Sequence, residues 1–141
     1  DAASRQPKPA REEREPADPG ALREALALAR SATRRGDFVK AREAVARAES
    51  LSPRAPEVVA ERAALDRAVK AEVQERIKRG IARFQLEDLD GAILEWGEAL
   101  ELDPANEIAL DYRRKAQGML KKIDELREQS RTGDTRSGVT R

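Results

Sequence analysis

The feature that most constrains the fold is the stretch covering residues 80–104, GIARFQLEDLDGAILEWGEALELDP. Its second half spaces Ala92, Trp96 and Ala99 four and then three positions apart, which places them on one face of a helix. A small, a large and a small residue on that face let a neighbouring helix approach closely while one aromatic ring fills the gap. Acidic residues interrupt the pattern before this helix and an Asp-Pro pair ends it. The stretch therefore predicts a helical hairpin in which Trp96 belongs to the core, although a binding hot spot is the alternative role for a tryptophan.

The hairpin pattern occurs a second time, earlier in the chain, at an offset of 51 positions. In each copy an aspartate precedes the second helix, and an alanine, a second alanine and a proline follow at spacings of seven and five: Asp37, Ala41, Ala48 and Pro53, then Asp88, Ala92, Ala99 and Pro104. An internal repeat of this kind predicts helical hairpins that stack on one another.

The composition indicates an all-α fold. Alanine, leucine, arginine and glutamate dominate, and no stretch alternates apolar and polar residues with the period of two that a half-buried strand requires. Between Pro56 and Gly80 no glycine or proline interrupts the apolar periodicity, so one long helix is expected to bridge two packing units. The predicted helices cover residues 21–35, 38–50, 57–86, 89–101 and 106–129.

These elements predict a short α-solenoid over residues 21–129. Two hairpins, residues 21–52 and 77–102, share the long central helix, and the C-terminal helix caps the array. Residues 1–20 are rich in proline and charge and lack large apolar side chains, so they are predicted to be a disordered, spacer-like tail. Residues 130–141, rich in glycine, serine and threonine, are predicted to be a frayed end.

The repeat resembles the tetratricopeptide repeat. Gly80 falls at the small position of the family's first helix, and Ala92, Trp96 and Ala99 fall at the alanine, aromatic and alanine positions of its second helix. The first copy matches at Ala41, Ala48 and Pro53, whereas Ala29 replaces the glycine and Val45 the aromatic residue.

The chain departs from the family in two respects. Arg76, Arg79 and Arg83 stand where the family often has tryptophan, leucine and tyrosine. The offset of 51 positions also exceeds the family's period of about 34 residues. The chain is therefore not expected to be a regular tandem array.

The resemblance implies a groove on the inner face of the first helix of each hairpin, where another protein or a peptide segment binds. The arginines of the first copy share one helix face and have the chemistry to pair with carboxylates of a partner, although a solvated helix face is the alternative. The predicted binding residues are Arg23, Arg30, Thr33 and Arg34 in the first copy and Gln74, Ile77, Ile81, Phe84 and Gln85 in the second.

The sequence offers no constellation for catalysis, a cofactor or a metal ion. The chain contains no histidine and no cysteine, which removes the commonest general base and the thiolate ligands. Glu87, Asp88 and Asp90 cluster in a turn between helices, where acidic residues cap and solvate, and they lack the spacing of a calcium loop. A non-catalytic protein without cofactors is expected.

Charge and hydropathy bear on nucleic-acid binding, on membrane insertion and on the location of the protein. The 28 basic and 27 acidic residues are spread along the chain, so nucleic-acid binding is not expected, although Arg23, Arg30, Arg34 and Arg35 are its candidates. No apolar run reaches the length of a membrane span. The chain starts at Asp1 rather than Met, which a cleaved export signal or an arbitrary starting point would explain. A periplasmic or envelope location, with an upstream lipid anchor, is slightly favoured over a cytoplasmic one.

Two functions follow from these observations. The first is a protein-interaction module that scaffolds a larger assembly, such as one in the bacterial cell envelope. The second is a structural protein that oligomerises through its C-terminal helix, whose apolar residues are spaced four and three apart like a coiled-coil seam. The alternative for this seam is packing within the same chain. The seam residues are Tyr112, Ala116, Met119, Ile123 and Leu126.

Overall fold

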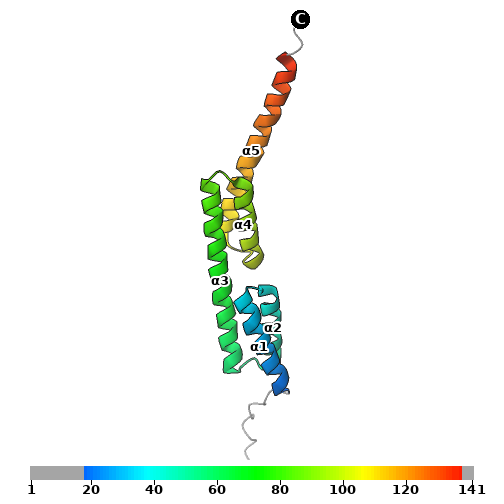
Figure 1. The fold of residues 1–141 in the computed structure, drawn as a ribbon, viewed down its shortest axis with the longest axis vertical. Coiled ribbons are helices and arrows are strands. Elements are labelled where there is room, and N and C mark those ends of the chain that lie inside the picture. Colours follow the sequence, from blue (N-terminus) through cyan, green and yellow to red (C-terminus); the bar gives the residue numbers. More distant parts are fainter. Residues whose placement is uncertain (1–17, 138–141) are drawn as a thin grey trace, which may run out of the picture. The chain divides into compact units, whose positions relative to one another are not determined.

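The structure, a computed structural model, describes the backbone of residues 18–137 and the side chains of residues 18–133. Of the tails predicted at residues 1–20 and 130–141, residues 1–17 and 138–141 lie outside this range. Within it the chain forms five helices and no strand, which confirms the all-α fold (Figure 1). None of these helices combines the length and apolarity needed to cross a bilayer. The helices are α1 (Pro19–Arg35), α2 (Phe38–Leu51), α3 (Pro56–Gln85), α4 (Leu89–Leu102) and α5 (Glu107–Ser137).

Helix α1 begins earlier than expected, inside the segment assigned to the N-terminal tail. The carboxylate of Asp18 accepts hydrogen bonds from the backbone N–H groups of Gly20 at 3.0 Å and Ala21 at 3.1 Å. Pro19 occupies the first helical position, where its fixed φ suits the helix and its missing N–H costs nothing. An aspartate cap followed by proline is a helix start, and it corrects the predicted boundary of the tail.

Helix α5 also extends farther than expected, through Ser137 rather than to residue 129. Residues 130–137 contain no proline, and a single glycine lowers helix stability without ending a helix. The hydroxyl of Thr132 donates to the carbonyl oxygens of Glu128 and Gln129, so this polar side chain satisfies itself within the helix. The prediction of a frayed end starting at residue 130 was therefore wrong for residues 130–137.

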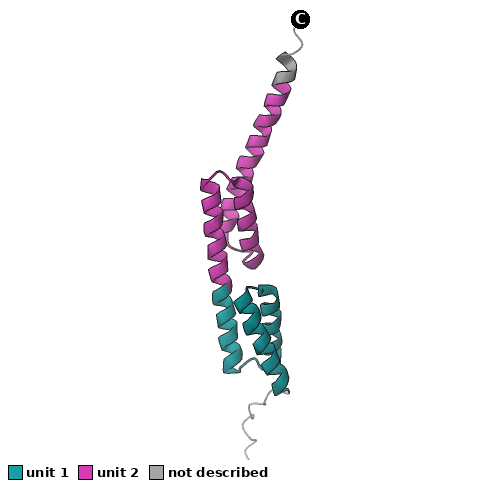
Figure 2. Cartoon of the chain, viewed as in Figure 1, with its two compact units in different colours: residues 1–68 teal, residues 69–141 magenta. Residues whose placement is uncertain are grey.

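The chain divides into two compact units, residues 1–68 (unit 1) and residues 69–141 (unit 2) (Figure 2). Unit 1 contains α1, α2 and the first half of α3. Unit 2 contains the second half of α3, α4 and α5. The predicted long helix is confirmed, and it supplies one helix to each unit.

The 51-residue offset extends over all three helices of each unit, beyond the hairpins recognised in the sequence. Helices α2 and α4 begin at equivalent positions, and so do α3 and α5. Eight buried positions of unit 1 have a buried equivalent in unit 2, so the core pattern is duplicated. The pairs are Leu22/Val73, Leu26/Ile77, Ala29/Gly80, Ala41/Ala92, Val45/Trp96, Ala48/Ala99, Val58/Ala109 and Leu65/Ala116.

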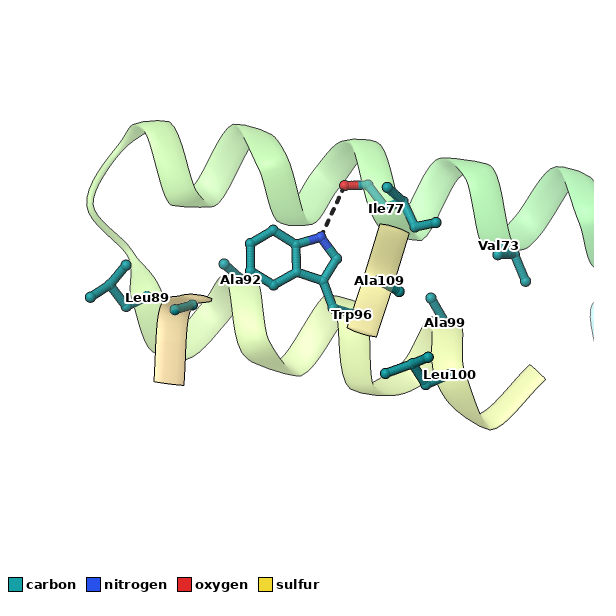
Figure 3. Packing of buried hydrophobic residues seen from close by; sticks show 9 residues of the cluster. Val73, Ile77, Leu89, Ala92, Trp96, Ala99, Leu100 and Ala109 are labelled. Carbon is teal, nitrogen blue, oxygen red and sulfur yellow. Dashed lines mark hydrogen bonds between the residues drawn. The ribbon is translucent and has the colours of Figure 1, made fainter. Parts of the chain in front are cut away.

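The core of unit 2 is organised around Trp96, which is fully buried, as the sequence predicted. The indole N–H donates to the carbonyl oxygen of Ile77 on α3 at 3.3 Å (Figure 3). A Cβ atom placed on Gly80 would lie only 2.3 Å from this indole nitrogen, so glycine lets the ring lie against the α3 backbone. The ring also stacks on Tyr112 of α5, with centroids 5.2 Å apart, and is tilted against Phe84 of α3 at 5.9 Å.

The core of unit 1 has no aromatic ring at the equivalent position, which Val45 occupies. Small side chains dominate the face that α1 and α2 bury against each other. The first half of α3 joins this core through the fully buried Val58 and Leu65. Unit 1 is therefore an alanine-rich bundle, whereas unit 2 is packed around aromatic rings.

Candidate interaction surfaces

The predicted binding residues of α1 have different surroundings. Arg23 and Arg34 are exposed, so their charges face solvent. Arg30 pairs with Glu61 of α3, with 3.1 Å between Nε and Oε2, and Glu61 is buried. The hydroxyl oxygen of Thr33 is buried and has no hydrogen-bond partner among the described residues. Arg30 is thus exposed like Arg23 and Arg34, but it forms an ion pair inside unit 1.

The predicted binding residues of α3 are divided between core and surface. Ile77 is only 8% exposed and belongs to the core cluster of unit 2, so its assignment to a binding surface was wrong. Its carbonyl lies against Trp96, and its side chain fills the interior beside Val73. Ile81 and Phe84 are half-buried against the same cluster. The remaining two residues, Gln74 and Gln85, are exposed.

The predicted oligomer seam of α5 also has two parts. Ala116 is fully buried, and Tyr112 and Ile123 pack against the core cluster of unit 2. Packing within the chain, the alternative interpretation, therefore accounts for these three residues, and Ala116 is corrected from seam to core. Met119 and Leu126 remain 42% and 60% exposed.

The three arginines that depart from the tetratricopeptide pattern form an ion-pair network in unit 2. Arg76, Arg79 and Arg83 of α3 converge on the buried Glu95 of α4, with nitrogen–oxygen distances of 3.4, 3.6 and 3.6 Å. Arg76 also pairs with Glu98 of α4. Because three guanidinium groups surround Glu95, the charge of this buried carboxylate is compensated. The arginines therefore join α3 to α4.

An open groove lies between α4 and α5 and has a volume of about 560 Å³. We call the apolar residues of its lining the floor of the groove; Leu100 among them is buried in the core of unit 2, and Leu94 is 64% exposed. No atom lies within 4 Å of a Cβ built on Gly97, so the floor is open at that point. Charged side chains stand among these apolar residues. The lining residues are Ile93, Leu94, Gly97, Glu98, Leu100, Glu101, Pro104, Leu110, Arg113 and Gln117.

The equivalent surface of unit 1 carries charge instead. The positions of Ile93 and Leu94 are taken by Arg42 and Glu43, and the position of Leu100 is taken by Glu49. Glu49 accepts two hydrogen bonds from Arg62 of α3, from Nε at 2.7 Å and from Nη2 at 2.9 Å. These hydrogen bonds lower the pKa of the Glu49 carboxyl below its ordinary value, because they favour the ionised form. In unit 1 a bidentate ion pair thus occupies the two positions that Leu100 and Arg113 hold in unit 2.

Helical periodicity did not indicate the α4–α5 groove, because it assigns the apolar residues in the second helix of each hairpin to packing. A signal was nevertheless available in the 51-residue offset. Aligning the two copies sets Ile93, Leu94 and Leu100 against charged residues. Leu100 belongs to the core of unit 2 and Ile93 packs against it, so the exposed Leu94 is the replacement that calls for an explanation.

Among the described side chains no group of three or more acidic residues is arranged to hold a metal ion. Comparison with known proteins found no match among family models, curated proteins or solved structures.

Proposed function

We propose that this chain is a non-catalytic protein-interaction module that holds a partner protein within a larger assembly. The observation that carries the proposal is the α4–α5 groove of unit 2, with its apolar floor and the exposed Leu94. Apolar side chains left exposed around a concave surface are typical of sites where another protein binds. The resemblance of the repeat to tetratricopeptide proteins, which bind peptides and other proteins, supports the same function.

Site-specific photocrosslinking in the cells that make the protein tests this proposal. A photoreactive residue replaces Leu94 in one variant and Glu43, its equivalent in unit 1, in the matched control. We expect the probe at position 94 to capture one defined partner and the probe at position 43 to capture none. Equal capture at both positions, or capture at neither, would contradict the proposal.

The second candidate function is self-association through α5, which the exposed Met119 and Leu126 favour. The buried Ala116 restricts such an interface to the C-terminal part of the helix. Light scattering at high micromolar concentration distinguishes the two functions, because a monomer excludes the oligomer. Replacing Leu126 with Lys is expected to abolish any dimer. The helix should stay folded, because the Leu126 side chain is exposed.

A further inference from the structure

Arg113 has an unusual position in the α4–α5 groove. It is half-buried and lines the cavity together with Leu100 and Leu110. Within the described part of the chain it forms no ion pair. Its guanidinium nitrogens are not among the buried side-chain atoms of the described residues that lack a hydrogen-bond partner, so they reach solvent, and the positive charge has no carboxylate of these residues beside it.

In unit 1 the arginine equivalent to Arg113 has a carboxylate partner. The equivalent of Arg113 is Arg62, whose carboxylate partner is Glu49. The equivalent of Glu49 in unit 2 is Leu100, so the arginine is present in both copies and the carboxylate only in one. The bidentate pair of unit 1 therefore indicates the kind of group that can pair with Arg113, a carboxylate.

We propose that the α4–α5 groove binds an amphipathic helix of a partner protein that inserts apolar side chains and pairs a glutamate or aspartate with Arg113. This inference rests on the proposed function and specifies the chemistry of the partner. The partner carboxylate takes the place that Glu49 takes beside Arg62 in unit 1. The apolar floor supplies binding area, and the ion pair supplies orientation.

A helix suits this groove better than an extended peptide. The groove is walled by two helices, whose backbone N–H and C=O groups are used within the helices, so no free strand edge is available for an extended chain. Two helices pack together when the ridges of side chains on one fit into the grooves between side chains on the other. Glu101, an exposed acidic residue among the lining residues, favours a basic residue on the same partner helix.

Segments of this chain fit the groove less well. Residues 1–17 contain no large apolar side chain to fill the floor. A second copy would present the exposed Met119 and Leu126 of its α5, and Lys122 lies on the same helix face three residues after Met119. That lysine would bring a positive charge toward Arg113. The groove therefore favours a different protein.

A display library of amphipathic helices, randomised at the flanking positions and selected on the full chain, tests the proposal. We expect enriched helices to carry an acidic residue at one flanking position, and replacing that residue with its amide to weaken binding about tenfold or more. Selection on the Arg113→Gln variant should lose the acidic preference. Arg114→Glu, a change at a neighbouring exposed residue paired with Asp111, should leave binding within about twofold of wild type.

The other outcomes separate this proposal from the proposed function. Enrichment of apolar helices without an acidic preference, abolished by Leu94→Asp, would overturn the role of Arg113 and leave the interaction module intact. Enrichment that is indifferent to Leu94→Asp, or no enrichment at all, would overturn both. Binding of wild-type chain to itself that Leu94→Asp abolishes would overturn the choice of partner, because a second copy would then occupy the groove.

Discussion

Units 1 and 2 share one pattern of buried positions but place their charges on different faces. In unit 1, buried alanines fill the α1–α2 interface, and the Arg30–Glu61 ion pair joins α1 to α3. In unit 2 the positions of Arg30 and Glu61 hold Ile81 and Tyr112, which pack against the core cluster.

The reverse exchange occurs on the other face. Three buried alanines of unit 1 correspond to charged residues of the network between α3 and α4 in unit 2. The pairs are Ala25/Arg76, Ala32/Arg83 and Ala44/Glu95. Small side chains allow the helices of unit 1 to approach closely, whereas long arginines bridge the helices of unit 2. The same register of core positions therefore tolerates either solution, provided that each buried charge has a partner.

Substitution of Trp96 is expected to cause the largest loss of stability that distinguishes the two cores. Replacing Trp96 with Ala removes a fully buried ring and its hydrogen bond, and should lower the free energy of unfolding of unit 2 by about 3–5 kcal/mol. The equivalent change, Val45→Ala, should lower that of unit 1 by about 1–2 kcal/mol, because only two methyl groups are lost. Amide hydrogen exchange measured residue by residue assigns each loss to its unit. Equal losses would show that the two cores do not differ as described.

Gly80 gives the next largest effect. Replacing Gly80 with Ala forces a methyl group into the indole of Trp96 and should cost about 1–3 kcal/mol in a chemical denaturation curve. Gly118→Ala, at a helical position with open space around it, should instead stabilise the protein by about 0.5–1 kcal/mol. Unit 1 combines alanine with valine at the equivalent pair of positions, so Gly80→Ala should cost much less when Trp96 is already Val. Additive losses in that double variant would contradict the steric explanation.

The turns of the two hairpins provide a smaller, reciprocal test. Gly36 and its equivalent Glu87 both adopt positive φ, 74° and 62°, and the aspartate after each of them caps the next helix. Glutamate pays a conformational penalty there that glycine does not. We expect Glu87→Gly to stabilise unit 2, and Gly36→Ala to destabilise unit 1, each by about 1 kcal/mol. Thermal unfolding checks both signs, and the same sign for both variants would refute the equivalence of the turns.

The Glu49–Arg62 pair predicts the smallest effect. Because Arg62 lowers the pKa of Glu49 in the folded state, the pair stabilises unit 1 above the ordinary pKa of 4.5, and this contribution is lost as the pH falls through the lowered pKa. More than a third of each side chain is exposed, so the effect should stay below about 1 kcal/mol. Glu49→Gln should flatten the pH dependence of the free energy of unfolding of unit 1 in this pH range, whereas Glu43→Gln should not. Hydrogen exchange measures this free energy. An unchanged profile in Glu49→Gln would contradict the assignment.

The sequence was sufficient to predict the fold class, the long helix α3 and the burial of Trp96, because helical periodicity and the positions of proline and glycine carry that information. It was insufficient for the role of Ile77, since an apolar residue on a helix is equally compatible with a core and with a binding face. The groove beside Arg113 depends on which residues two helices leave uncovered, and the spacing within one helix does not contain that information.

The double use of α3 has a consequence for how such a chain lengthens. Since the last helix of one unit is the first helix of the next, each added period contributes two helices rather than three, so that two units require five and three would require seven. In α5, Asp124 and Glu128 stand where Val73 and Ile77 stand in α3. Acidic residues thus occupy two positions at which a further unit of the same register would need apolar side chains.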